Sequence, residues 1–529
     1  MPTDCISYQN SGYFSKLIVD YLNQKPELQS LYHRFPDLSN FKLQIEEKST
    51  NFDQRNRAIL VGSLQKQYTG FDISEFTSDN ITLLNDSKTF TITTGHQLNL
   101  FTGPLYFLYK IVSVINLCKQ LKATYPDYHF VPIYWMATED HDFEEINYFN
   151  FRDKKIQWNV PSHGPVGRLS TQGLETVYAT FEKELGIGDN ANHLRDLFKK
   201  AYLEHTNLAD ATRYLANALF QEEGLVIVDG DDVELKRIFA PFVQRELIEQ
   251  TSFQEVTATN KELANYDIQV NPREINLFYV EDQLRERIVT EKGKYIVNNT
   301  KIEFSESEIL AVLETHPEKF SPNVILRPLY QEVILPNLCY IGGGGEIAYW
   351  LQLKSNFQRN AITFPILSVR NSVLIALEKQ VQKMDKLDLS WTDLFMNPLV
   401  LSNKKTKELS GVAIDFSIQK EFLKQQFEKL HAIARQTDKS FTGAVKAQEA
   451  KQIKGLENLE KRLLKAEKRV HEDQLKRIFE LQNQLFPNQS LQERKQNFSE
   501  FYIESGNSLI SKLLTELDPL EQKFSILIL

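Results

Sequence analysis

The stretch TFTITTGHQLNLFTGPLYFLYKIVSVINLCKQL, residues 89–121, decides the predicted fold. It starts with a short β-branched run at residues 89–94, which is typical of a strand. After a polar loop it continues as a mostly apolar helix, for which Pro104 suits the first position. The apolar run FVPIYWM, residues 130–136, follows as a second strand. A strand, a helix and a strand in this order predict a βαβ unit, from which parallel sheets are built.

Further apolar runs extend this predicted sheet, at residues 225–228, 324–326, 339–341 and 362–367. Such continuous runs are typical of strands that are covered on both faces. Two inserts interrupt them, a helical one at about 150–222 and a strand-rich one at about 250–320, which has turn signals at Lys292-Gly293 and Asn298-Asn299. We therefore predict an α/β fold with a parallel-sheet core over residues 1–375.

The pattern changes to charge-rich helix at residues 376–490. Apolar residues there follow alternating four- and three-residue steps, which predicts a coiled-coil seam through Leu423, Phe427, Leu430, Ala434, Thr437 and Phe441, and again through Leu456, Leu459, Leu463, Ala466 and Val470. A turn between two antiparallel helices is expected at residues 437–443. The last segment, 491–529, ends in the apolar FSILIL and is predicted to dock on the core.

The bulk composition excludes several classes of protein. The 529 residues carry a formal net charge of −9, which gives no global attraction to nucleic acid or to anionic membranes. The cysteines, Cys5, Cys118 and Cys339, have neither zinc-ligand spacing nor the density of a disulfide framework. The sequence shows no apolar stretch of bilayer length and no secretory leader pattern, so we expect a cytoplasmic protein.

A first polar cluster follows the strand at residues 89–94. Open α/β sheets bind ligands where strand carboxyl ends and helix N-termini converge. Gly95 would let backbone approach a ligand, and His96, Gln97 and Asn99 supply hydrogen bonds or proton transfer. The alternative is a loop whose polar groups satisfy only its own backbone.

A second polar cluster, ATEDHDFEE, follows the next strand and should lie at the same sheet edge. Glu139, Asp140, His141 and Asp142 crowd together, and such crowding suits a general base, an ammonium group or a divalent ion. A helix N-terminus enriched in acids is the alternative. A single histidine among carboxylates is a weak zinc signal, so no metal site is assigned.

A third candidate is the run IGGGGEIAYW. Its glycines, Gly342, Gly343, Gly344 and Gly345, suggest backbone amides that face a phosphate or carboxylate, with Glu346 and Tyr349 one turn into a helix. A tight turn that needs positive φ explains the run equally well. Upstream, Arg327 could clamp a carboxylate, with Gln331 beside it. Arg168 and Arg370 are further anion-binding candidates.

Taken in order, several of these motifs resemble the bacillithiol-synthesis cysteine-adding enzyme family, BshC. The resemblance rests on TTGHQLNLFTGPLYFLYK, VPIYWMATEDHDFEE, GPVGR, FSPNVILRPLYQE, YIGGGGEIAYWLQL, KRLLKAEKR and LFPNQSLQER, which together span nearly the whole chain. The family usually has TGQQ where this chain has Gly95-His96-Gln97, and GGPGE where this chain has glycines before Glu346.

The resemblance implies a Rossmann-like core with connecting inserts and a coiled-coil domain that pairs two subunits into a homodimer. It implies a ligase that adds cysteine to glucosaminyl-malate in the last step of bacillithiol synthesis. On this basis we assign catalytic roles to His96, Asp140 and His141, and substrate or nucleotide binding to the other residues named in the three clusters. ATP, with Mg²⁺, is the candidate activator, and an already activated cysteine donor is the alternative.

Two other functions compete with the ligase. One is a nucleotidylyltransferase-like enzyme that stops at an adenylated product. The other is a non-catalytic coiled-coil scaffold, against which the two polar loops at one sheet edge argue.

Overall fold

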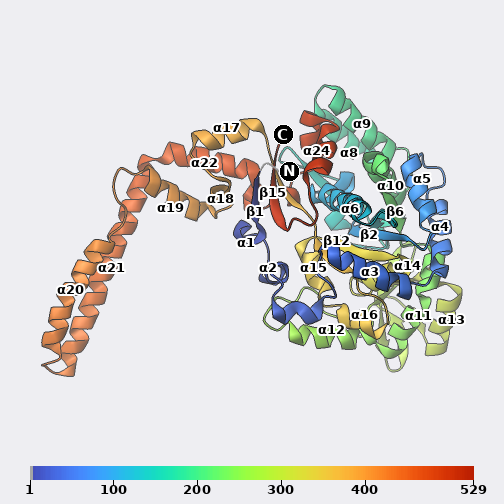
Figure 1. The fold of residues 1–529 in the computed structure, drawn as a ribbon, viewed down its shortest axis with the longest axis horizontal. Helices are drawn as coiled ribbons and strands as arrows, with labels where there is room; N and C mark the ends of the chain where they lie inside the picture. The colour runs from blue at the N-terminus through green and yellow to red at the C-terminus, as the bar shows by residue number, and fades with distance from the viewer. Residues whose placement is uncertain (1–3) are drawn as a thin grey trace. The chain divides into compact units, whose positions relative to one another are not determined.

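The computed structural model describes residues 4–529 and divides the chain into two compact units. The first unit comprises the chain up to Ile375 together with Leu491–Leu529, and the second is Ala376–Ser490. Figure 1 labels the elements of both units. In the described residues, no helix is long and apolar enough to cross a membrane.

The first unit is built on a five-stranded parallel sheet. Its strand order is β13 (Ile366–Val369), β12 (Asn337–Gly342), β2 (Thr89–His96), β3 (His129–Met136) and β6 (Val226–Asp229). All eight residues of β2 are buried, which explains why its apolar and threonine residues do not alternate with charged ones. Helix α6 (Tyr106–Thr124) connects β2 to β3, so the predicted βαβ unit is confirmed. The helix begins two residues after Pro104.

The core of this unit lies between the sheet and its helices. Phe41 and Ile45 of α3 (Leu38–Asn51) pack in one apolar cluster with Ile92 of β2, Val114 of α6 and Ile341 of β12. Other helices of this part of the chain are α1 (Tyr8–Ser11), α2 (Lys16–Leu22), α4 (Arg55–Gln67), α5 (Glu75–Leu83), α11 (Val233–Glu249), α14 (Arg327–Ile334), α15 (Gly344–Trp350) and α16 (Lys354–Arg359).

One predicted strand is wrong. Residues 324–326 form a turn before α14, because the Asn323 side chain accepts hydrogen bonds from the backbone N–H groups of Ile325 and Leu326. An asparagine that bonds the backbone two residues on favours a turn over a strand. The nearest strand is the short β11 (Phe320–Pro322), which belongs to a different sheet.

The inserts are mixed in secondary structure. The first contains the hairpin β4 (Tyr148–Phe151) and β5 (Lys154–Gln157), followed by α8 (Leu174–Leu185), α9 (Asp189–Tyr202) and α10 (Leu208–Phe220). The second contains α12 (Thr251–Glu262), α13 (Glu306–Thr315) and an antiparallel sheet in the order β10 (Glu303–Phe304), β9 (Lys294–Val297), β8 (Leu284–Glu291), β7 (Leu277–Glu281) and β11. Ser305 and Glu308 form a capping box at the start of α13.

The C-terminal segment packs within the first unit. Strand β15 (Lys523–Ile528) pairs with β1 (Asp4–Ser7) and β14 (Ser372–Ala376), and α23 (Ser499–Ser505) and α24 (Ser508–Glu516) precede it. Asn497 donates hydrogen bonds to the carbonyls of Phe101, at 2.8 Å, and Gly103, at 2.6 Å. Phe101 and Thr102 have positive φ, which costs energy for non-glycine residues. Asn497 therefore fixes a strained loop between β2 and α6.

The second unit is helical. It consists of α17 (Glu378–Lys386), α18 (Trp391–Leu394), α19 (Pro398–Leu409), α20 (Ser417–Ala434), α21 (Lys439–Val470) and α22 (Glu472–Leu485). Helices α20 and α21 form an antiparallel hairpin, with an ion pair between Lys420 and Glu460 and a hydrogen bond between His431 and Glu449. The turn occupies residues 435–438, earlier than the predicted 437–443. It ends at Asp438 because the Asp438 side chain caps α21, which begins at the next residue.

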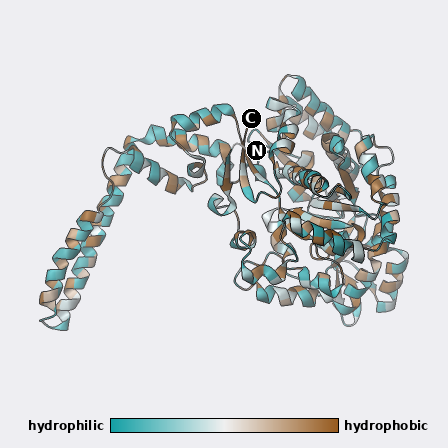
Figure 2. Cartoon of the chain, in the orientation of Figure 1, coloured by the Kyte–Doolittle hydropathy of each residue, from teal (hydrophilic) through white to brown (hydrophobic). Residues whose placement is uncertain are grey.

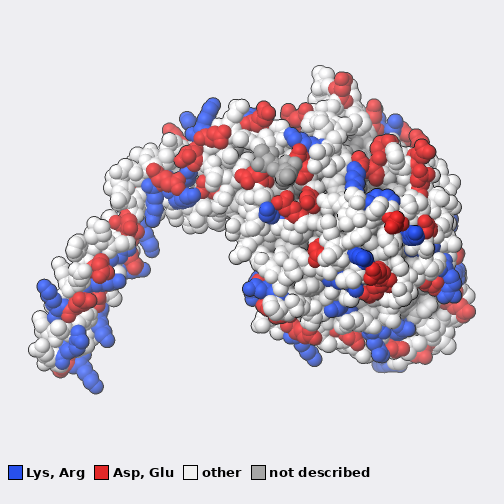
Figure 3. All heavy atoms as spheres, viewed as in Figure 1, with Lys and Arg blue, Asp and Glu red and all other residues white. Residues whose placement is uncertain are grey.

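Apolar residues recur along α20 and α21 among polar ones (Figure 2), and lysine, arginine and acidic side chains alternate over their surface (Figure 3). Phe427, Ala434 and Val445 form a buried cluster between the two helices. Other apolar seam residues stay exposed, and Leu459 and Val470 keep 52% and 71% of their surface in water. The hairpin alone therefore covers only part of its apolar seam.

Candidate functional site

The predicted polar loops meet at the carboxyl edge of the parallel sheet. In the register of β2 and β3, Gly95 lies beside Trp135 and His96 beside Met136, so the two strands end at the same level. Strand β12 ends at Gly342 beside Val369 of β13. Loops after β2, β3, β12 and β13 therefore converge, as expected for the ligand-binding edge of an open α/β sheet.

A cavity of about 830 Å³ opens at this edge, a size typical of small-molecule sites. Most of the sequence-predicted site residues line it: Gly95, His96, Gln97, Glu139, Asp140, His141, Arg327, Gly343, Gly344, Gly345, Glu346 and Tyr349. Residues of the strand-rich insert and the C-terminal segment complete its wall, with further cations at Lys110, Arg273, Arg285, Arg287, Arg370 and Arg494. The cavity thus combines carboxylates with many positive charges.

Gln97 joins the first two loops. Its side-chain amide donates to the Asp140 carboxylate at 2.8 Å and to Glu145 Oε2 at 2.9 Å. Burial opposes the charge of Asp140, but hydrogen bonds from the His141 backbone N–H and the Gln97 amide, with the nearby charge of Arg285, lower its pKa well below the usual value. Asp140 is therefore an anionic acceptor at neutral pH and not a proton donor.

His96 is almost fully buried in the cavity wall. Burial lowers its pKa well below that of a free histidine, and the nearby Lys110 charge adds to this effect. Its Nε2 atom has no hydrogen-bond partner within the described chain. A neutral imidazole with an unpartnered nitrogen can hydrogen-bond a ligand, whereas it is a weak base.

His141 is held by an arginine of the strand-rich insert. Arg285 Nη1 lies 2.6 Å from His141 Nδ1, and the guanidinium carbon of Arg285 lies 4.0 Å from the centroid of the Phe278 ring. A guanidinium can only donate, so Nδ1 accepts and the ring proton of a neutral His141 is on Nε2. His141 can therefore donate a hydrogen bond from Nε2.

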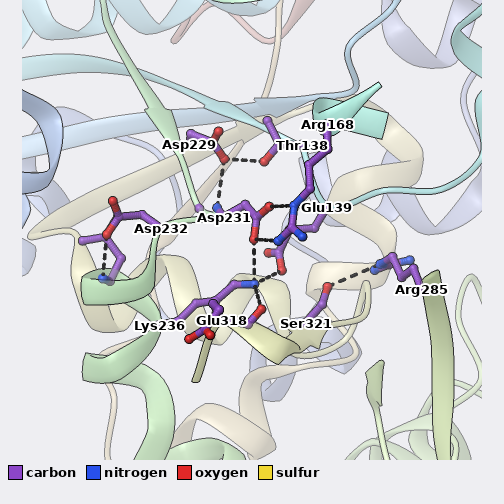
Figure 4. A network of polar contacts seen from close by, with 12 residues as sticks. Thr138, Glu139, Arg168, Asp229, Asp231, Asp232, Lys236, Arg285, Glu318 and Ser321 are labelled. Carbon is purple, nitrogen blue, oxygen red and sulfur yellow. Dashed lines mark hydrogen bonds and ion pairs between the residues drawn. The ribbon is translucent and has the colours of Figure 1, made fainter. Parts of the chain in front are cut away.

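Glu139 is the carboxylate with the surroundings of a general base. Burial raises its pKa, although Lys236 Nζ, 2.8 Å from its carboxylate, opposes that shift. Lys236 also contacts Asp231 at 2.9 Å, and Arg168 forms a two-pronged contact with Asp231 (Figure 4). This network fixes the position of Glu139. Arg168 serves it as a structural ion-pair residue and does not line the cavity.

The neighbouring strand end has a further carboxylate with a shifted pKa. Burial and the negative charge of Asp231 raise the pKa of Asp229 to about 6. The Thr138 hydroxyl donates to Asp229, as Figure 4 shows. Thr138 precedes Glu139, so this contact also anchors the second polar loop.

The glycine run does not form the tight turn that was the alternative to an anion site. None of Gly342–Gly345 has positive φ, so the run is not a left-handed turn. The Gly343 N–H donates to Glu346 Oε2 at 2.9 Å and is therefore already used within the chain. Glu346 in turn contacts Lys110 Nζ at 2.6 Å and accepts from the Tyr340 hydroxyl at 2.7 Å.

Four predicted site residues do not line the cavity: Asn99, Asp142, Gln331 and Gly342. Asn99 donates to the Glu145 carbonyl at 3.2 Å and so stabilises the loop. Asp142 precedes the short helix α7 (Phe143–Ile146) and is exposed. Gln331 is fully buried behind Arg327. Gly342 is the last residue of β12, where a Cβ would approach that of Glu346 to 2.9 Å.

Sequence reasoning missed most of the cations. Lys110 is the one charge in the apolar first part of helix α6, residues 106–118, a pattern that indicates a buried pair. Arg285 and Arg287 lie two residues apart on β8 and hence on one face of the strand, which could have been noticed. Arg273 lies in an irregular segment and Arg494 at the end of a short 3-10 helix, and neither carries a comparable pattern.

The carboxylates of the site do not form a dedicated metal centre. Among residues 4–529, no group of three or more histidine, cysteine, aspartate or glutamate side chains is arranged to hold a metal ion. A metal ion that is held mainly by substrate phosphates would need fewer protein ligands.

Comparison with known proteins agrees with this architecture. A family model described as "Bacillithiol biosynthesis BshC, N-terminal Rossmann-like domain" matches residues 1–371, and the "C-terminal coiled-coil domain" of the same family matches residues 373–529. The chain belongs to the BshC family. The family resemblance predicted from the motifs is therefore confirmed, as is the fold class of a Rossmann-like core with a coiled-coil arm.

Several relatives in the BshC family are similar over their full length. A protein of Flavobacterium johnsoniae is 64% identical over 527 residues, and the alignment covers 100% of both chains. Proteins of Flavobacterium psychrophilum and Christiangramia forsetii are 64% and 55% identical, with 100% of this chain and 99% of each relative covered. All three carry the name "Putative cysteine ligase BshC".

Proposed function

We propose that this protein is a cytoplasmic ligase that joins the carboxyl group of cysteine to the amine of glucosaminyl-malate, in the last step of bacillithiol synthesis. The observation that carries the proposal is the charge pattern of the cavity. Carboxylates from the loop after β3 lie in the same cavity as the cations of α14, β8 and the C-terminal segment. Such a cavity suits one ligand with an ammonium group and another with two carboxylates.

Amide formation requires that the attacking amine lose a proton. Glu139 is suited to accept it, because burial raises its pKa and so makes its carboxylate a stronger base. Asp140 stays anionic and can hold an ammonium group, while the unpartnered Nε2 of His96 can orient a substrate. These roles distribute the chemistry over the two loops that Gln97 connects.

A carboxylate must also be activated before it forms an amide, and we propose ATP, with Mg²⁺, as the activator. The residues fit a polyphosphate, because Arg327 Nη2 is buried at the cavity without a hydrogen-bond acceptor from the described chain. ATP would supply the leaving group that the amine displaces from the cysteine carboxylate, either phosphate, with release of ADP, or AMP, with release of pyrophosphate. Arg327, Arg370 and Lys110 would supply positive charge beside it.

The proposal is tested by incubating the purified protein with cysteine and glucosaminyl-malate, with and without ATP and Mg²⁺, and by mass spectrometry of the products. We expect bacillithiol to form only when ATP is present. An adenylated product without an amide would instead favour a nucleotidylyltransferase. Amide formation from a pre-activated cysteine donor alone would remove ATP from the proposal, and no product under any condition would favour the scaffold.

Gly345 tests whether the glycine run borders the substrate. A Cβ at Gly345 would meet only Gln269 Oε1, at 4.0 Å, and Gln269 also lines the cavity. Gly345→Val should therefore raise the KM for glucosaminyl-malate by about tenfold, since each lost contact of about 1.4 kcal/mol is worth that factor. Gly455→Val is the control, because a Cβ there would meet nothing within 4 Å and Gly455 does not line the cavity. Equal KM values for both variants would contradict this placement.

We also propose a homodimer that is formed through the hairpin of α20 and α21. The exposed seam residues of these helices leave an apolar stripe in water, and a second copy of the same stripe would cover it. Replacing both Leu459 and Leu463 with glutamate should convert the dimer to a monomer in light scattering at micromolar concentration. Lys465→Glu, at an exposed position outside the seam, should leave the dimer intact. A monomeric wild-type protein would contradict the proposal.

A further inference from the structure

Arg327 is held from behind by a buried hydrogen bond. The guanidinium lines the cavity, and its Nη1 atom donates to Gln331 Oε1 at 3.0 Å, one turn along α14. Its Nη2 atom has no acceptor in residues 4–529. The Trp135 and Tyr340 rings lie 5.9 and 5.7 Å from the guanidinium carbon, and Tyr349 also interacts with Arg327. Among these contacts, the hydrogen bond from Nη1 to Gln331 is the one that sets the rotation of the guanidinium and hence the direction of Nη2.

Glu332 determines which end of the Gln331 amide faces Arg327. Glu332 Oε1 accepts from Gln331 Nε2 at 3.0 Å and from Asn337 Nδ2 at 2.6 Å. An ionised carboxylate can only accept hydrogen bonds, so the amide nitrogen must face Glu332. The amide oxygen is then left to face Arg327.

Asn337 is itself oriented by the central strand of the sheet. The hydroxyl groups of Thr91 and Thr93 donate to Asn337 Oδ1 at 3.2 and 2.8 Å. The Asn337 amide nitrogen is therefore directed to Glu332. Glu332 is thus fixed from one side by the sheet and from the other by the ion pair described next.

Lys48 favours the ionised form of Glu332, because its charge opposes the rise in the pKa of Glu332 that burial causes. Its Nζ atom lies 3.0 Å from Glu332 Oε2, and the two side chains are only 2% and 0% exposed. Lys48 comes from α3, at the end of the buried stripe that contains Phe41, Gln44 and Ile45. Replacing a buried ion pair with apolar residues is often neutral for stability, so this pair is not explained by stability alone.

We propose that Lys48 and Glu332 are positioning residues, which act through Gln331 to orient Arg327 toward a substrate carboxylate or phosphate. Without Lys48, the buried Glu332 would favour its protonated form, because an isolated charge is costly in the interior. A protonated carboxyl group can donate as well as accept, so the Gln331 amide would lose its fixed orientation. Arg327 would then occupy several orientations in the cavity.

Lys48→Met tests this proposal. The kinetic part of the test rests on the proposed function. We expect the KM for glucosaminyl-malate or ATP to rise about tenfold, as for a weakened charged hydrogen bond, with a smaller change in kcat. Lys48→Arg should restore most of the affinity, because it returns the positive charge. Glu332→Gln is a second variant that can be used if Lys48→Met fails to fold. It should raise KM in the same way.

Gln44→Leu is the matched control. Gln44 is fully buried one turn earlier on α3, but it contacts the Phe364 carbonyl and Arg34 and does not reach Arg327. It should lower stability and leave KM unchanged. An equal rise in KM for Gln44→Leu would reduce Lys48 to a packing residue and overturn the proposal.

A double-mutant cycle with Arg327→Ala separates this proposal from the proposed function. The Lys48→Met effect on KM should vanish when Arg327 is absent, whereas independent effects would contradict the coupling. If the wild-type protein makes no amide, the proposed function fails and the crystal structure of Lys48→Met decides the positioning role. A guanidinium that keeps its hydrogen bond to Gln331 and its wild-type orientation would overturn that role.

Discussion

Asp140→Ala should lower the turnover of the ligase reaction about a hundredfold, because a preorganised charge beside the reacting groups is typically worth that much. The side chain is an anionic acceptor that lines the cavity and binds the Gln97 amide. Its removal takes away the charge that would hold an ammonium group and separates the first two loops. The measurement is kcat with cysteine and glucosaminyl-malate, together with the thermal midpoint of unfolding.

Asp142→Ala is the control for this prediction. Asp142 lies two residues further along, is exposed and does not line the cavity. Its replacement should leave kcat within about twofold, as expected for surface sites away from the reacting groups. Normal turnover in Asp140→Ala would exclude the second loop from the site, and an equal loss in Asp142→Ala would indicate a general effect of negative charge.

Glu493→Ala should destabilise the first unit by about 3–5 kcal/mol, the usual cost of leaving one partner of a buried ion pair uncompensated. Glu493 contacts Arg370 at 2.6 Å, with the side chains 1% and 4% exposed, and it also accepts from the Val373 N–H at 3.1 Å. These contacts of Glu493 hold the C-terminal segment against Arg370 and the start of β14. Because Arg370 lines the cavity, the same change should weaken anion binding.

Urea unfolding measures this loss of stability. Glu303→Ala provides the comparison, because its ion pair with Lys294 is exposed and exposed pairs contribute little. A similarly small effect for Glu493→Ala would contradict the claim that the C-terminal segment is held by Arg370. The loss of stability in Glu493→Gln should lie between those of Glu493→Ala and Glu303→Ala, because glutamine can still accept hydrogen bonds but carries no charge.

The sequence predicted the elements whose pattern is local. The βαβ unit at residues 89–136 was recognisable because β-branched strands and an apolar helix differ in length and composition. The strand predicted at residues 324–326 was wrong because the Asn323 side chain, and not the apolar pattern, determines the backbone there. Strand β14 pairs with β15, which lies at the far end of the chain, so no local pattern identified it.

The same distinction holds for the candidate site. His96, Asp140 and Glu346 were predicted because they lie at or shortly after strand ends, and the parallel register brings those strand ends together. Gln331 was expected to bind substrate, but helical geometry buries it one turn behind Arg327. Lys48 was not anticipated, because its partner Glu332 is 284 residues away in the chain. Its role depends on tertiary packing that no motif spacing encodes.

The most direct test of the central claim is the thiol content of a strain that lacks this protein and has no second BshC copy. We predict that such cells accumulate glucosaminyl-malate and contain no bacillithiol, and that the wild-type chain restores the thiol whereas Asp140→Ala does not. Normal bacillithiol in the deletion strain would contradict the assignment of this protein as the cysteine-adding ligase.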